Sequence, residues 1–151
     1  MTGSPPGMGT ARHGLVIGKF YPPHTGHHLL IRAAAEVCER VTVVVMASGV
    51  ESIPLSDRVT WIAQTHADEA VSVVGVTDNV PIDYGSDEIW MAHVALVEAA
   101  IGRDVTVRGL GAKAAKVDLV VTAESYGEGL ARRLGAEHLC VDPARDREPV
   151  S

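Results

Sequence analysis

The chain of 151 residues lacks the features that mark several classes of protein. Its two cysteines, Cys38 and Cys140, stand far apart in apolar surroundings, which argues against a disulfide scaffold and predicts buried structural thiols. No apolar run approaches the roughly 20 residues of a membrane span, so we expect no membrane segment. Positive charge is also scarce, because the net charge of −6 argues against a large nucleic-acid interface.

Two common nucleotide-binding signatures are missing as well. No G-x-x-x-x-G-K-[ST] sequence occurs, so a Walker-type phosphate loop is not supported. Gly109 and Gly111 are followed by Ala114 where a dinucleotide fingerprint needs a third glycine, and they do not follow a clear strand. A nucleotide site in this chain would have to be built in another way.

The amino-terminal segment 1–13 is rich in glycine, serine and proline and has no apolar stretch. We expect a disordered leader there rather than a signal peptide, followed by one domain from 14 to 151. A cytoplasmic location follows by default.

Apolar runs of strand length alternate with segments whose apolar residues recur at helical spacing. The predicted strands cover 14–17, 41–47, 71–76, 117–122 and 137–141. Four helices are predicted. The first follows the segment 18–27, the second and third are capped by Ser56 and Ser86, and the fourth runs over 126–134. The third helix should end at Gly102, with a short strand at 105–107 as one interpretation of the next segment. This alternation predicts an α/β fold: a Rossmann-like, doubly wound parallel sheet of about five strands flanked by helices in a single domain.

The segment Gly18–His27 lies between the first predicted strand and the first predicted helix. Lys19 supplies a point charge suited to phosphate, while His24 and His27 can both face the helix N-terminus, where backbone N–H groups favour an anion. Gly18 and Gly26 allow close approach and tight packing. Together these residues predict a triphosphate site. A zinc site of His24, His27 and His28 is less well supported, because no nearby Cys, Asp or Glu completes it.

This segment, G-K-F-x-P-x-H-x-G-H, resembles the signature of the H-x-G-H nucleotidyltransferase superfamily. It is most similar to the nicotinamide-nucleotide adenylyltransferase domain of bifunctional adenylyltransferase/ribosylnicotinamide kinase proteins. Further agreement comes from D-R-x-x-W at 57–61, from Trp90, and from V-D-P-x-R at 141–145 with P-V-S at 149–151. The resemblance thus spans residues 14–151.

The resemblance implies adenylyl transfer from ATP to nicotinamide mononucleotide (NMN), giving NAD and pyrophosphate, by direct in-line attack with Mg²⁺ screening the phosphates. It implies catalytic roles for His27, Lys19 and His24. ATP would be bound by Gly18, Phe20, Gly26, Glu124, Tyr126, Arg145 and Ser151. The acceptor would be bound by Trp90, through stacking, and by Arg58.

The residues alone leave several of these roles open. Trp90 could instead pack in the core, as we expect for Trp61, and Arg58 could be a surface ion-pair residue. Residues 124–126 could be a plain polar loop. Two other functions also stay open: a related nucleotidyltransferase with another phosphorylated acceptor, and a non-catalytic module that binds NAD or ATP.

The superfamily has a second motif, Ser-x-[ST]-x-x-[RK], which holds the triphosphate. The chain ends at Ser151, the first position of that motif, so we expect a domain truncated at its C-terminal end. The sequence leaves open whether the chain forms a homo-oligomer and whether a kinase domain follows it in the native protein.

Overall fold

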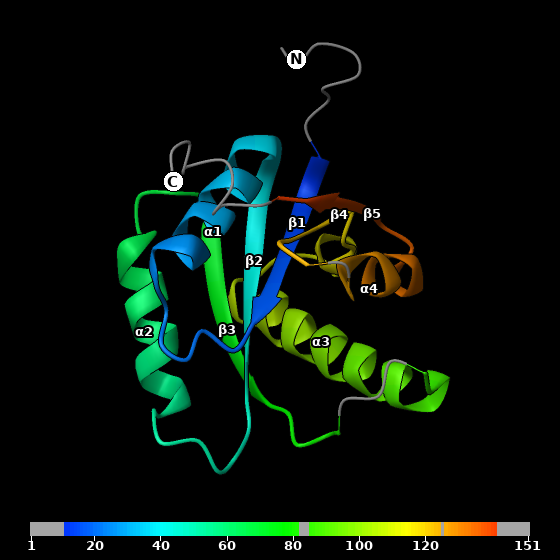
Figure 1. The fold of residues 1–151 in the computed structure, drawn as a ribbon. Helices are drawn as coiled ribbons and strands as arrows, with labels where there is room; N and C mark the ends of the chain where they lie inside the picture. The colour runs from blue at the N-terminus through cyan, green and yellow to red at the C-terminus, as the bar shows by residue number, and fades with distance from the viewer. Residues whose placement is uncertain (1–10, 82–84, 125, 142–151) are drawn as a thin grey trace, which may run out of the picture.

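The computed structural model describes residues 11–81, 85–124 and 126–141 and shows a sheet covered by helices (Figure 1). The elements in chain order are β1 (Ala11–Gly18), α1 (Thr25–Val37), β2 (Cys38–Ala47), α2 (Leu55–Thr65), β3 (Val71–Thr77), α3 (Asp87–Val107), the 3₁₀ turn η1 (Ala112–Ala115), β4 (Leu119–Thr122), α4 (Tyr126–Leu134) and β5 (Glu137–Cys140).

The five strands form one parallel sheet in the order β3-β2-β1-β4-β5. From β1, the chain adds β2 and then β3 on one side of the sheet. It then crosses to the other side of β1 and adds β4 and β5, so the direction of winding reverses between β1 and β4. In open parallel sheets, ligands bind beyond the carboxyl ends of the strands at such a switch point. The predicted Rossmann-like fold is confirmed, and its switch point lies directly after Gly18.

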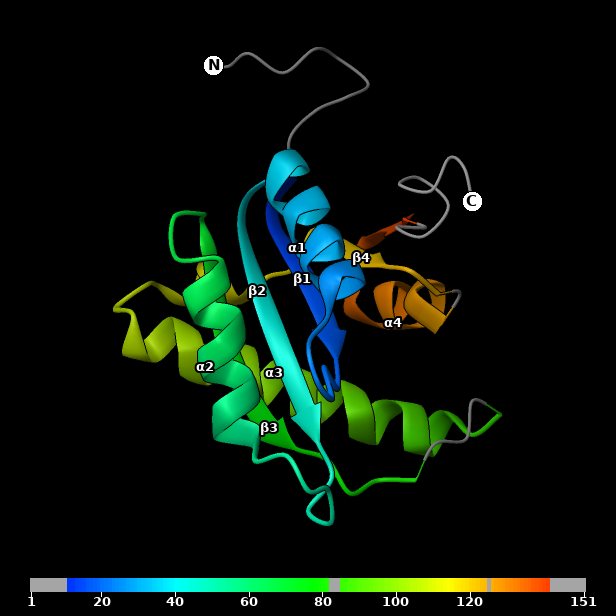
Figure 2. The same cartoon turned by 60° about the vertical axis from the view of Figure 1, so that its left-hand side comes forward.

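The helices cover both faces of the sheet. On one face α1 and α2 lie over the sheet, as Figure 2 shows from the side of these helices. They pack there against side chains that include Val16, Val43 and Val121. On the other face α3 and α4 pack against Leu15 and Val120. Adjacent residues of one strand face opposite layers, which explains why the strands read as continuous apolar runs. Within the described residues, no helix is long and apolar enough to cross a membrane.

Several strand and helix limits differ from prediction. β1 begins at Ala11 and pairs with β2 from Ala11 onward, so residues 11–13 belong to the sheet rather than to a leader. α2 begins after Pro54, not after Ser56: Pro54 is the N-cap residue, and its carbonyl accepts from the N–H groups of Asp57 (3.2 Å) and Arg58 (3.3 Å). Ser86 does cap α3 by accepting a hydrogen bond from the N–H of Ile89.

The third helix does not end at Gly102. It continues to Val107, and the expected strand at 105–107 is its last turn. Val94, Val97, Ile101 and Val105 are buried in the same core cluster at helical spacing. This stripe holds the helix together across the glycine, which weakens a helix by only about 1 kcal/mol.

Two predictions of burial are wrong. Cys38 is buried, and burial raises the pKa of its thiol to about 11, but Cys140 is exposed at the end of the edge strand β5. Trp61 is 43% exposed. The buried residues of α2 are Arg58 and Ile62, and Trp61 lies one position, or about 100° around the helix, from Ile62.

Candidate active site

His24 and His27 form a reciprocal cap at the N-terminus of α1. The N–H of Gly26 donates to Nδ1 of His24 (3.1 Å), and the N–H of His24 donates to Nδ1 of His27 (3.1 Å). The two rings stack with centroids 3.7 Å apart. The H-x-G-H spacing thus produces a helix cap made of two imidazoles, which satisfies backbone donors at the helix start.

The cap determines the tautomer of both rings. Because each Nδ1 accepts a hydrogen bond, the proton of each neutral imidazole lies on Nε2. Burial, with the nearby His24 and His28, lowers the pKa of His27 from 6.5 to about 4. At neutral pH, His27 is therefore an uncharged N–H donor. Its position at the positive end of a helix favours the same uncharged form.

The ring of Phe20 packs against this cap. Its side chain is buried and its ring meets the ring of His27 edge-on at 4.8 Å, while its backbone has a φ of 49°. The glycines on either side make room: an added Cβ at Gly18 would lie 3.2 Å from the Phe20 ring, and one at Gly26 would lie 3.1 Å from the His24 ring. Gly26 thus allows the tight packing that the sequence predicted.

Lys19 is exposed and pairs with Glu51, which comes from the loop after β2. The same carboxylate contacts Nη1 of Arg58 (3.0 Å) and accepts from the N–H of Ser48 (3.1 Å). The hydrogen bond from Lys19 is the main cause that lowers the pKa of Glu51. Glu51 therefore links the loop after β1, which carries Lys19, to the loop after β2.

Arg58 lies beneath these loops rather than on the surface. It is 1% exposed, donates to the carbonyls of Lys19 (3.1 Å) and Ile53 (2.7 Å), and sits 4.9 Å from the ring centroid of Tyr21. The sequence offered a surface ion pair or a ligand contact for Arg58. In the structure, Arg58 braces the loops and is not among the residues that line the cavity described next.

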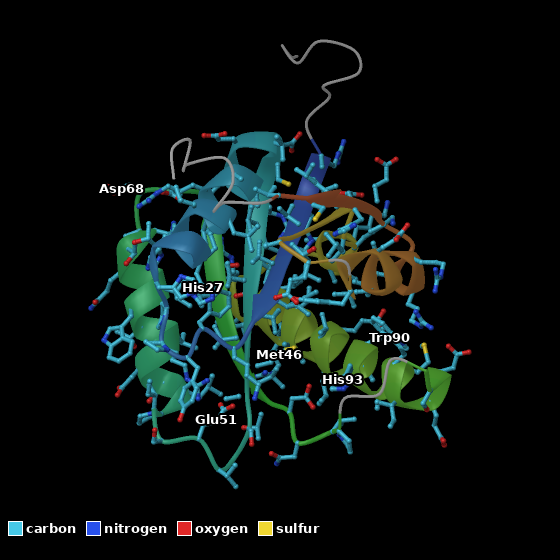
Figure 3. All side chains as sticks on the ribbon, in the orientation of Figure 1. His27, Met46, Glu51, Asp68, Trp90 and His93 are labelled. Carbon is cyan, nitrogen blue, oxygen red and sulfur yellow. The ribbon has the colours of Figure 1, made fainter. Side chains whose placement is uncertain are left out.

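A cavity of about 680 Å³ opens at the carboxyl ends of the strands. Its polar lining includes several residues predicted from sequence: Lys19, His24, His27, Trp90, Glu124 and Tyr126. The backbone at Gly18 and Phe20 also lines it, and Gly26 lies within the helix cap. Figure 3 shows His27 on one side of Met46, with Trp90 and His93 on the other. Three loops converge on this cavity, those after β1, β3 and β4.

Sequence reasoning missed several residues of the lining, among them Met46, Asp78 and His93. Nδ1 of His93 lies 2.6 Å from Oδ2 of Asp78, and its Nε2 lies 3.1 Å from the carbonyl of Pro81. His93 thereby fastens α3 to the loop after β3. The signal was present, since Asp78 directly follows a strand and His93 is three positions after Trp90, on the same helix face.

The third histidine of the zinc hypothesis is engaged elsewhere. Nδ1 of His28 lies 2.9 Å from Nε2 of His66, whose Nδ1 lies 2.8 Å from a carboxylate oxygen of Glu69. These contacts join α1 to the end of α2. Across the described parts of the chain, no group of three or more His, Cys, Asp or Glu residues is placed to hold a metal ion. Arg145 and Ser151 lie outside the described residues, so their predicted roles stay predictions.

Comparison with solved structures identifies the fold. A bifunctional NMN adenylyltransferase/ADP ribose pyrophosphatase from Francisella tularensis, complexed with AMP and a manganese ion, superposes with a TM-score of 0.61 at 15% identity, covering 88% of this chain and 37% of that one. The chain has a nucleotidyltransferase-like fold. NadR protein in complex with NAD and AMP-PNP gives a TM-score of 0.60 at 16% identity, covering 88% of this chain and 38% of that one. NadR protein in complex with NR gives a TM-score of 0.62 at 16% identity, covering 91% of this chain and 39% of that one.

The chain spans about two fifths of the length of these structures, and the identities are low. No family model and no curated protein matches the sequence. The comparisons therefore establish the nucleotidyltransferase-like architecture, and the chemistry has to be argued from the site itself.

Proposed function

We propose that the chain transfers an adenylyl group from ATP to NMN, giving NAD and pyrophosphate. The observation that carries the proposal is the double-histidine cap: two imidazoles with their protons on Nε2, at a helix N-terminus, on the wall of a cavity large enough for a nucleotide. The fold supports it, since the similar structures include an NMN adenylyltransferase and NadR complexes with NAD and NR.

The reaction needs no covalent enzyme intermediate. A phosphate oxygen of the acceptor attacks the α-phosphorus of ATP, a new P–O bond forms, and the bond to the β-phosphate oxygen breaks to release pyrophosphate. Negative charge shifts from the acceptor to the leaving pyrophosphate, so the protein acts by positioning and charge stabilisation. His24 and His27 donate from Nε2 to phosphate oxygens, and Lys19 supplies the positive charge.

Other residues of the cavity lining would bind the two nucleosides. Glu124 and Tyr126 follow β4 and would bind the adenosine side, while Trp90 would stack on the nicotinamide ring. A divalent cation would enter with the ATP phosphates as part of the substrate. The cavity carboxylates Asp78 and Glu124 belong to no cluster of three metal-binding side chains among the described residues, which fits a cation held mainly by phosphate.

The test is an assay of the purified chain with Mg²⁺, ATP and a panel of acceptors: NMN, phosphocholine, glycerol phosphate and phosphopantetheine. Pyrophosphate release with NMN, and NAD as the product, is the expected result. Release with another acceptor alone would assign a related nucleotidyltransferase instead. Calorimetric binding of NAD or ATP without any turnover would contradict the proposal and favour a non-catalytic nucleotide-binding module.

A further inference from the structure

Arg133 of α4 lies against the indole of Trp90 on α3. Its guanidinium carbon is 4.3 Å from the ring centroid, its Nη2 donates to Oδ1 of Asp87 (2.6 Å), and its Nη1 donates to the carbonyl of Gly129 (3.1 Å). The stacking contact and the two hydrogen bonds, one to a backbone carbonyl and one to an exposed carboxylate, together favour one orientation of the planar guanidinium. The contact therefore constrains the position of Trp90 as well as that of Arg133.

Gly129 constrains the same indole from a second direction. A Cβ at this position would lie 2.9 Å from Cζ2 and 3.0 Å from Cη2 of Trp90, which is closer than real Cβ contacts. The benzo edge of the indole thus packs directly on the backbone of α4. Any side chain at position 129 would push the ring away from α4.

Trp90 also borders the cavity. Neither Arg133 nor Gly129 belongs to the cavity lining. Arg133 and Gly129 thus contact the indole from outside the cavity lining, and we expect Arg133 to affect a ligand through Trp90.

We propose that Arg133 is a positioning residue of the acceptor subsite, which fixes the indole of Trp90 so that it presents a firm wall to a planar ring of the acceptor. This inference rests on the proposed function for the identity of the acceptor. The contacts of Arg133 and Gly129 with the indole do not depend on the proposed function.

The first arm of the test needs no turnover. The sequence has two tryptophans, so Trp61→Phe leaves Trp90 as the single indole emitter, and Trp61 is exposed on α2, away from the cavity lining. In that background, Arg133→Met should shift the Trp90 emission and raise its acrylamide quenching constant about twofold, because the guanidinium no longer covers a ring face. The matched control Arg132→Met removes an exposed charge one position away and should change neither quantity.

The second arm measures kinetics. Arg133→Met should raise the KM for NMN about fivefold, the effect of one lost stacking contact, while kcat and the KM for ATP stay within about twofold. Gly129→Ala should produce the same acceptor-specific change. Alanine is the better helix former, so a loss in this variant reflects the contact with Trp90 rather than a weaker helix.

Unchanged Trp90 emission in Arg133→Met would overturn the proposal. So would an equal loss for both substrates together with a lower Tm in both variants, since that is the result of a purely structural contact between α3 and α4. If the parent chain shows no turnover with any acceptor, the adenylyl-transfer assignment fails, and the quenching arm still decides whether Arg133 holds Trp90.

Discussion

His24 and His27 are joined twice: their rings stack at 3.7 Å, and the backbone N–H of His24 donates to Nδ1 of His27. One residue of the pair therefore positions the other. The imidazole of His27, whose Nε2–H we propose to donate to phosphate, also accepts a backbone hydrogen bond at the start of α1 through Nδ1. Changes at His27 should affect activity and stability through different atoms, which makes the two effects separable.

His27→Ala should lower kcat by on the order of 10²-fold, comparable to the loss of one oxyanion donor. It should also destabilise the fold by about 1 kcal/mol, because the N–H of His24 loses its acceptor. His27→Gln should restore most of the stability, since an amide at this helix position can reach back to the cap, and should restore less of the activity. Steady-state kinetics and urea unfolding measure the two quantities. A turnover of His27→Ala within a few-fold of the parent would refute the role of Nε2–H.

Lys19→Met should raise the KM for ATP about tenfold and leave the KM for the acceptor nearly unchanged. The expected size is that of one exposed charge-assisted contact to phosphate, about 1.4 kcal/mol. Higher salt should narrow the difference between parent and variant, because Lys19 is exposed and its interactions are screened. An unchanged KM for ATP at low salt would contradict the assignment.

Arg58→Met should destabilise the fold by about 2 kcal/mol or more, since breaking a buried ion pair leaves Glu51 without one partner and two backbone carbonyls without donors. Arg108→Met is the matched control, because Arg108 is exposed at the end of α3, and it should change stability by less than about 0.5 kcal/mol. Urea unfolding of both variants compares them. Equal stabilities would mean that the buried guanidinium does not brace the loops.

Stability should fall as the pH drops below about 6.5. The pKa of His27 is lowered from 6.5 to about 4, mainly by burial, and burial also lowers the pKa values of His13 and His28. Below pH 6.5 the unfolded chain therefore binds more protons than the folded chain. The stability that depends on these neutral histidines is fully present above pH 6.5 and is lost as the pH falls. The expected slope is about 1.4 kcal/mol per pH unit for each histidine that must be protonated to unfold.

Urea unfolding at pH 7.5, 6.5 and 5.5 measures this slope. His13 provides a check, because its Nδ1 and Nε2 contact the carbonyl of Lys116 (2.8 Å) and the hydroxyl of Thr42 (2.7 Å) far from the cavity. His13→Asn should reduce the slope without changing substrate binding. A stability that is flat from pH 7.5 to 5.5 would show that these histidines titrate normally.

Local patterns were sufficient for the sheet and for the histidine loop. The apolar runs at 41–47 and 71–76 became β2 and β3, and the spacing of His24 and His27 placed both on one helix end. The roles of Asp78 and Arg58 depend on contacts between elements distant in sequence. The sequence left Arg58 open as a surface ion-pair residue or a ligand contact. Its burial follows from the Lys19 carbonyl, which comes from the loop after β1, and from the Glu51 carboxylate and the Ile53 carbonyl, which come from the loop after β2.

The left-handed backbone of Phe20 has a consequence for how the site can change. A φ of 49° costs a non-glycine residue about 1 kcal/mol or more, so glycine at this position would relax the loop. Glycine would also remove the ring that packs against the imidazole of His27. The Phe20 side chain is buried in the core, so its loss would cost about 3 kcal/mol or more, which exceeds the strain of the backbone. Packing of this one ring therefore retains both the strained loop and the position of the His27 imidazole.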